Sequence, residues 1–412
     1  MFIHCRRSVG KVQPQIHVEN FSGFHRAVSI TFLAVSFHSR LLMTFLLSAL
    51  AFVLLLTVLI LIHEFGHFIA ARKAGVVVEE FGFGLPPQGK VLFRQGGTDF
   101  SINWIPFGGF VRLKGENAYT EKERTEPGSF ASASIPARLV ILTAGVCMNF
   151  LLAIALLTVG FSVGRWVPTY FSIEEMQRAA DKGVISMELG VLIEKVVSGG
   201  TAAKIGVPER SILLAVDDIP VIDPSDVQRI QDGKKRVKYT MLSGDGFSEE
   251  ITMTVPLDEG KSGVLISAYP RNLSSPKRHA STAFMLALRE TRVMTKQTVL
   301  GITQLFSSLA QSGRVPEGIT GLVGIAQLTY VSVQQGFMVY LRLVALLSLS
   351  LAVLNIFPFP ALDGGRVVFV LAEFIGRRPV NRKFEIVVNA VGFFVLLGVI
   401  FLITFYDIIR LF

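Results

Sequence analysis

The stretch Leu61-Ile-His-Glu-Phe-Gly-His-Phe68 ends an apolar run that begins at Leu41. From Leu41 to Ile62 there are 22 residues without a charged side chain. That length crosses a hydrocarbon core of about 30 Å at about 1.5 Å per residue. The sequence therefore predicts a membrane-spanning helix that carries a His-Glu-His cluster at its end. Ionisable groups in such a segment are functional by default.

His63 and His67 are four residues apart, so they lie on one helix face and can bind a single cation. Imidazole nitrogen suits zinc, and a catalytic zinc site typically has three protein ligands and one position open to water. Glu64 is placed to take a proton from that water and to return it to a leaving amine. The alternative is a cluster of polar side chains that reach the interface at the end of a span, without a metal.

The composition is that of a membrane protein. Hydrophobic residues make up 51% of the chain, charged residues make up 17%, and the mean hydropathy is +0.53. These values exclude a disordered chain and a nucleic-acid-binding protein. The net charge of +9 is spread along the sequence, which indicates membrane topology and attraction to anionic lipid. Cys5 and Cys147 are too few for a disulfide framework.

Hydropathy predicts three further spans, at Leu139 to Val163, Leu343 to Phe357 and Ile386 to Ile403. The stretch Ile319 to Val331 is shorter and more polar, and we expect an interfacial or re-entrant helix there. Lys and Arg residues gather between spans one and two and between spans three and four. The positive-inside rule places both loops in the cytoplasm and residues 165 to about 341 on the far side.

A second motif, Asn355-Ile-Phe-Pro-Phe-Pro-Ala-Leu-Asp-Gly-Gly365, follows the third span directly. Its two prolines cannot continue a helix, so the backbone must turn and offer Asp363 on a bent segment. The topology puts Asp363 at the same membrane face as the two histidines, where it would complete a zinc site. The alternative is a turn whose aspartate only caps the next helix.

Together the two motifs resemble the site-2 protease family of intramembrane zinc metalloproteases, in particular the bacterial regulator of sigma-E protease group. Other matching segments are Phe81 to Gly84, Ile105 to Val111, and Gly145 with Asn149 in the second span. The resemblance covers the chain from about Met43 to the C-terminus. It departs from the family in two places: Gly145-Val146 stands where the family has Gly-Pro, and only one PDZ-like stretch is present where better-known relatives have two.

The resemblance implies a function and a site. His63, His67 and Asp363 would be the zinc ligands, Glu64 the general acid/base, and Asn355 a stabiliser of the substrate or the oxyanion. The substrates would be single-span membrane proteins, such as an anti-sigma factor or a remnant signal peptide, trimmed first by an upstream site-1-type protease. The protein would be a multi-pass protein of the bacterial inner membrane, with its active site near the cytoplasmic face and the PDZ-like domain in the periplasm.

We expect an α-helical membrane protein with about four transmembrane helices, a membrane-associated β-hairpin or sheet, and one inserted PDZ-like β-rich domain. The hairpin is predicted at Val91 to Leu113, where residues 100–105 alternate as in a strand, and it would pair with extended substrate. An ordinary cytoplasmic hairpin is the alternative.

The PDZ-like domain is predicted at about 186–269, from strand-like and turn-like segments at 190–197, 201–206 and 211–218. Some other small β domain is its alternative. An amphipathic connector is expected between Ala283 and Leu309, either on the membrane surface or packed against the PDZ-like domain.

The expected organisation has five parts, which are residues 1–42, 43–164, 165–275, 276–340 and 341–412. The first is an N-terminal extension that we expect to be disordered or non-native, because a basic flank before Met43 conflicts with the orientation that His63 requires. The second and last parts form the membrane core, the third contains the PDZ-like domain and the fourth is the connector. Two other functions stay open: a non-catalytic PDZ membrane adaptor with a structural metal, and a zinc protease that acts on water-exposed peptides.

Overall fold

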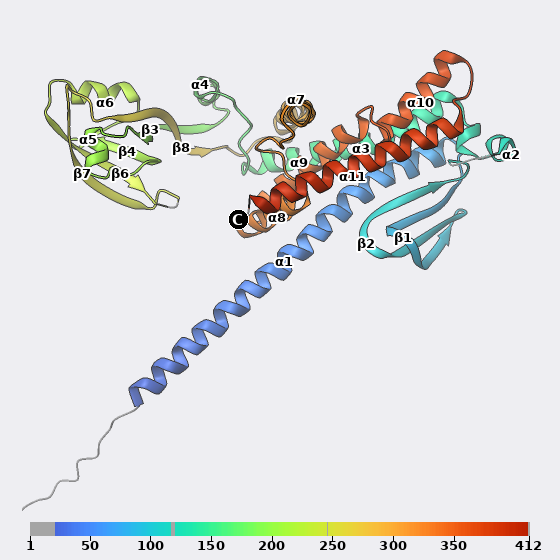
Figure 1. The fold of residues 1–412 in the computed structure, drawn as a ribbon, viewed down its shortest axis with the longest axis horizontal. Helices are drawn as coiled ribbons and strands as arrows, with labels where there is room; N and C mark the ends of the chain where they lie inside the picture. Colours follow the sequence, from blue (N-terminus) through green and yellow to red (C-terminus); the bar gives the residue numbers. More distant parts are fainter. Residues whose placement is uncertain (1–20, 117–119, 245, 411–412) are drawn as a thin grey trace, which may run out of the picture.

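A computed structural model describes residues 21–116, 120–244 and 246–410 (Figure 1). Most of the expected N-terminal extension, residues 1–20, lies outside the described residues. The first helix, α1 (Phe21–Lys73), begins within that expected extension and continues into the first span.

Among the described residues, four helices are long and apolar enough to cross a membrane, as the hydropathy predicted. They are residues Met43–Lys73 of α1, α3 (Ile135–Val163), α9 (Phe337–Ile356) and α11 (Arg382–Ile409). The predicted span in α11 is shorter than the helix at both ends, the spans in α3 and α9 start inside their helices, and the first span stops before Lys73, because charged and small residues at the ends of the apolar runs remain helical. His63 and His67 lie within α1, ten and six residues before its last residue, Lys73.

Helix α3 is the centre of the bundle and packs against α1, α7, α9 and α10 (Figure 1). Its approach to α1 is close at Gly66, where an added Cβ would lie 2.4 Å from the carbonyl oxygen of Ala144. Small residues allow this kind of close packing between membrane helices. The face of α3 that packs on α1 therefore lies against the turns of α1 that carry His63 and His67.

The expected connector is the long helix α7 (Ala280–Ser312). Its buried residues Ala283, Ala287 and Met294 join a core with residues of α3 and α9. This packing is against the helix bundle and not against the PDZ-like domain, and the position of α7 on the membrane surface stays a prediction. The predicted short helix is α8 (Leu322–Gln335), and the carboxylate of Asp407 in α11 accepts hydrogen bonds from the backbone N–H groups of Gly321 and Gly324 at its start.

A long antiparallel hairpin, β1 (Val78–Gln95) and β2 (Thr98–Leu113), follows α1. Its two-residue turn is Gly96-Gly97, and both glycines have positive φ, as tight hairpin turns require. The hairpin was predicted, but its start at Val91 was wrong, because the glycines, prolines and glutamates of residues 79–90 hide the strand pattern of β1. Two short helices, α2 (Glu121–Thr125) and the 3₁₀ helix η1 (Phe130–Ser132), lead from the hairpin to α3.

A separate β-rich domain is inserted between α3 and α7 and lies at the opposite end of the bundle from the hairpin (Figure 1). Its antiparallel sheet has the strand order β7-β6-β4-β3-β8, with β5 paired to β4. The strands are β3 (Ser186–Val196), β4 (Ser211–Val216), β5 (Ile219–Pro220), β6 (Arg236–Ser243), β7 (Glu249–Pro256) and β8 (Val264–Ser274). The helices of this region are α4 (Ile173–Asp181), α5 (Thr201–Lys204) and α6 (Pro224–Gln231). Val191, Leu213 and Tyr239 are fully buried in its core.

We expect Leu213→Ala to destabilise the β-rich domain by about 2 to 5 kcal/mol, because it removes a fully buried side chain and leaves a cavity. Ile222→Ala is the control, since Ile222 is 60% exposed, and it should change stability by less than about 0.5 kcal/mol. Hydrogen exchange of the intact protein in detergent measures both. Equal protection in the two variants would contradict the assigned core.

Candidate active site

Two segments that are distant in sequence meet in the helix bundle, near the end that carries the hairpin. Helix α1 supplies His63 and His67, and the chain after α9 turns at the two prolines and starts α10 (Asp363–Gly376) with Asp363 itself. The turn is tight, because an added Cβ on Gly364 would lie 2.2 Å from the carbonyl oxygen of Phe357. A side chain at position 364 would clash with the neighbouring backbone, so glycine is required there. The tight turn places the first turn of α10 beside α1.

The donor atoms of His63, His67 and Asp363 all lie within 4.8 Å of one another. The Oδ2 atom of Asp363 is 2.9 Å from Nε2 of His63 and 3.4 Å from Nε2 of His67, and the two Nε2 atoms are 3.2 Å apart. Three ligands of a tetrahedral zinc ion, each about 2.0–2.1 Å from the metal, are about 3.3 Å apart. The spacing and the donor types therefore fit zinc, and the three residues that the sequence predicted as ligands are brought together.

Hydrogen bonds on the far side of each imidazole fix its orientation. Nδ1 of His67 lies 2.8 Å from the carbonyl oxygen of Ile141. A carbonyl can only accept, so Nδ1 carries the proton and Nε2 turns its lone pair toward the cluster. The side-chain amide of Asn149 lies 3.3 Å from Nδ1 of His63 and is fully buried beside it. Both partners come from α3, so this helix orients both histidines.

Gly145 of α3 leaves room for the imidazoles. An added Cβ would lie 2.5 Å from Nε2 of His67 and 2.8 Å from Nε2 of His63. In the sequence, Gly145 was singled out only by the family resemblance. The structure shows the steric reason for a residue without a side chain at this position. Val146, which stands where the family has proline, is buried in an uninterrupted α3.

Glu64 and Asn355 lie beside the three predicted ligands. Glu64 lines a cavity of about 220 Å³ together with His67 and Asp363, and the amide nitrogen of Asn355 lies 3.2 Å from Nε2 of His63.

Sequence reasoning missed two residues that line the same cavity, Glu116 and Arg366. Arg366 follows Asp363 by three residues on α10, and this spacing could have placed it on the same helix face. Glu116 carries no such signal, because it follows β2 in a loop and reaches the site only through the fold.

Comparison with known proteins agrees with this geometry. The sequence profile of peptidase family M50 matches residues 51–399. A protein of Fusobacterium nucleatum named "Putative zinc metalloprotease" is 30% identical over 375 residues, which cover 90% of this chain and 100% of that protein. Proteins with the same description are 28% identical in Clostridium perfringens, covering 85% of this chain and 95% of that protein, and 29% identical in a Nostoc species, covering 87% and 95%. The family profile spans the predicted ligands on α1 and α10 and the bundle between them, and the chain therefore belongs to peptidase family M50, the zinc metalloproteases of the site-2 protease type.

Proposed function

We propose that this zinc metalloprotease is an intramembrane endopeptidase that cleaves single-span membrane proteins within or beside their membrane segment. One observation carries the proposal: the cluster of His63, His67 and Asp363 lies inside a bundle of helices long and apolar enough to cross a membrane. A protease acting only on water-exposed peptides has no need to place its ligands on such a helix. The depth of the site along α1 favours a substrate that is itself in the membrane.

Each site residue has a proposed role. His63, His67 and Asp363 hold the zinc ion, which supplies Lewis-acid polarisation of the peptide carbonyl and an acidified water. Glu64 takes the proton of the attacking water and delivers it to the amine of the departing peptide. Asn355, with its amide nitrogen beside His63, donates a hydrogen bond to the carbonyl oxygen as negative charge develops there.

The hairpin is proposed to receive the unwound substrate. A transmembrane helix hides its carbonyls in hydrogen bonds that cost several kcal/mol each to expose in lipid, so a cleaved segment needs new backbone partners. The hairpin borders the site, because Phe110 and Val111 of β2 line the same cavity as Glu64. Large apolar side chains such as Trp104, which is 75% exposed, suit insertion of the hairpin into the membrane.

The β-rich domain is proposed to be PDZ-like and to recognise or exclude substrates by size. Strand β8 pairs only with β3 at the edge of the sheet, which is the arrangement that accepts an added peptide strand. Its position at the opposite end of the bundle from the hairpin supports a periplasmic domain and a site nearer the cytoplasmic face of a bacterial inner membrane (Figure 1). We propose substrates of the anti-sigma factor or remnant signal peptide type, trimmed first by a site-1-type protease in regulated intramembrane proteolysis.

A non-catalytic adaptor with a structural metal is the competing function. Glu64 distinguishes the two, because a structural zinc site needs no base. We expect Glu64→Gln to lower cleavage of a panel of single-span substrates by at least about 100-fold, the size of a general acid/base contribution, while zinc content is retained. Glu79→Gln, an exposed carboxylate on β1, is the control and should cleave normally. Full cleavage by Glu64→Gln would leave the adaptor as the better assignment.

We expect Asp363→Asn to weaken zinc binding at least 10-fold. Replacing a residue that only hydrogen-bonds a metal ligand already lowers metal affinity by about 10- to 100-fold, and loss of a ligand should lower it at least as much. The substitution is nearly isosteric and keeps the first turn of α10. Competition with a chelator measures the affinity of the purified protein. Unchanged affinity would remove Asp363 from the ligand set.

We expect Ile105→Pro in β2 to lower cleavage about tenfold without loss of zinc, because proline removes one backbone donor and such a hydrogen bond is worth about 0.5–1.5 kcal/mol. Ile105→Ala removes the same side chain but keeps the amide. Cleavage by the alanine variant should stay within about twofold of the parent protein. Equal cleavage by both variants would argue against strand pairing of the substrate at this position.

A further inference from the structure

We infer that Glu116 and Arg366 are positioning residues that hold Asp363 at the metal site and link it to the hairpin. The inference rests on the proposed ligand role of Asp363. It concerns a partly buried polar cluster that the proposed chemistry does not itself use.

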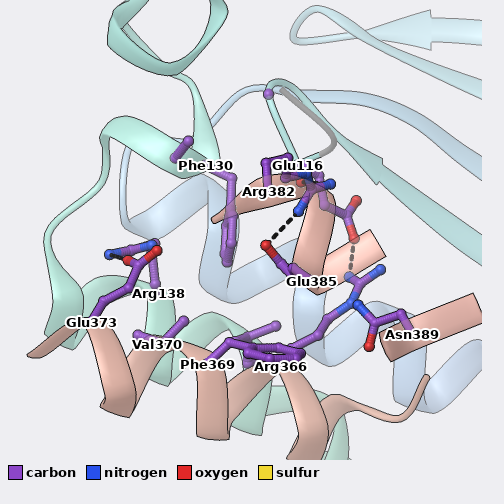
Figure 2. Close-up of a pocket in the computed structure, with 13 residues that line it drawn as sticks. Glu116, Phe130, Arg138, Arg366, Phe369, Val370, Glu373, Arg382, Glu385 and Asn389 are labelled. Carbon is purple, nitrogen blue, oxygen red and sulfur yellow. Dashed lines mark hydrogen bonds and ion pairs between the residues drawn. The ribbon is translucent and has the colours of Figure 1, made fainter. Parts of the chain in front are cut away.

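The cluster lines a second cavity of about 70 Å³ beside the catalytic one (Figure 2). Three ion pairs border it: Glu116 with Arg366, Arg138 with Glu373 at 2.7 Å, and Arg382 with Glu385 at 2.8 Å. Glu116 and Arg366 also line the catalytic cavity, whereas the residues of the other two pairs do not. This pair alone among the three therefore separates the two cavities.

Glu116 contacts three elements at once. One carboxylate oxygen, Oε1, accepts a hydrogen bond from Nη1 of Arg366 in α10. The other, Oε2, accepts from the backbone N–H of Leu113, the last residue of β2, at 3.4 Å. Its own carbonyl oxygen accepts from Nη2 of Arg382 in α11 at 3.4 Å. One residue thus joins the end of the hairpin to the starts of α10 and α11.

Arg366 lies in the first turn of α10, three residues after Asp363 and on the same helix face. The residue that precedes the helix, Leu362, gives no side-chain cap, so no capping side chain fixes this end. The ion pair with Glu116 supplies that restraint. The side chains of Glu116 and Arg366 are 17% and 39% exposed, and removing one partner of a partly buried pair leaves the charge of the other uncompensated. Loss of the pair should therefore let the Asp363 turn shift relative to the two histidines.

The pair of Arg138 and Glu373 is a natural control. It joins the same helix α10 to α3, and its side chains are 12% and 14% exposed. Glu373 lies ten residues beyond Asp363, which is about 15 Å along the helix. Breaking this pair should loosen α10 without moving its first turn.

The experiment compares Glu116→Gln, Arg366→Met and Glu373→Gln, with Asp363→Asn as the reference, in the full-length protein in detergent. Zinc affinity is measured by chelator competition, stability by thermal unfolding, and kcat and KM with one single-span substrate. Glu116→Gln and Arg366→Met should lower zinc affinity on the order of 10-fold and lower kcat more than they change KM. Glu373→Gln should lower the unfolding temperature but keep zinc affinity within about twofold. The exchanged pair Glu116→Arg with Arg366→Glu should recover part of the lost affinity.

The inference is overturned if Glu116→Gln and Arg366→Met bind zinc as the parent protein does while Asp363→Asn binds it weakly. It is also overturned if Glu373→Gln weakens zinc binding as much as they do, because the effect would then follow stability alone. If Asp363→Asn itself keeps full zinc affinity, the proposed ligand set fails, and this inference fails with it. Glu116→Gln is nearly isosteric, so it keeps the test decisive even where Arg366→Met does not fold.

Discussion

The structure depends on one constraint, that two imidazole nitrogens and one carboxylate oxygen must point at the same place inside an apolar helix bundle. The Nε2 atoms of His63 and His67 lie 3.2 Å apart, and the carboxylate oxygen of Asp363 lies 2.9 Å from the first. In the deprotonated forms that bind a metal, such a group is unfavourable in a low-dielectric interior without a cation. The donors satisfy one another best through a shared metal, which binds α1 to α10 across 300 residues of sequence.

The rest of the bundle is arranged to make that meeting possible. Gly145 removes a side chain that would occupy the space of both imidazoles, and Gly364 lets the α10 turn close on the backbone of Phe357. Helix α3 then supplies the oxygen of Ile141 and the amide of Asn149, which orient the two rings from behind. Through Ile141 the second span determines which nitrogen of His67 is available, and through Asn149 it holds the ring of His63 in place.

The sequence predicted the parts of this site that rest on local periodicity. The spacing of His63 and His67 on a helix, and the bend that offers Asp363, follow from short motifs and elementary backbone rules. The four spans follow from hydropathy, although charged end residues extend the helices beyond the apolar runs. What could not be predicted depends on tertiary contact: the entry of α7 into the bundle through Ala283 and Ala287, the length of β1, and the approach of Glu116 to Arg366. Glycine- and proline-rich sequence hides β1, and no pattern in a single chain reports a loop carboxylate that pairs with a helix 250 residues later.

Each of the two ends of the bundle combines apolar packing with contacts of charged side chains. At the end of the β-rich domain, Trp166 is buried against Gly160, where an added Cβ would lie 2.0 Å from the indole ring, and its Nε1–H donates to the carbonyl oxygen of Met338 at 3.1 Å. Buried Glu290 of α7 accepts from both the backbone N–H and the hydroxyl of Thr169, at 2.9 and 2.6 Å. The segment that enters the domain is thus bound to α7 and α9, and the guanidinium of Arg342 in α9 also lies 3.6 Å from Glu290. At the hairpin end, an apolar cluster joins α1, the hairpin and α3, and ion pairs connect α10 to α3 and to the loop after β2 (Figure 2). Since Asp363 starts α10 at this second end, the position of the proposed third ligand depends on these ion pairs as well as on packing.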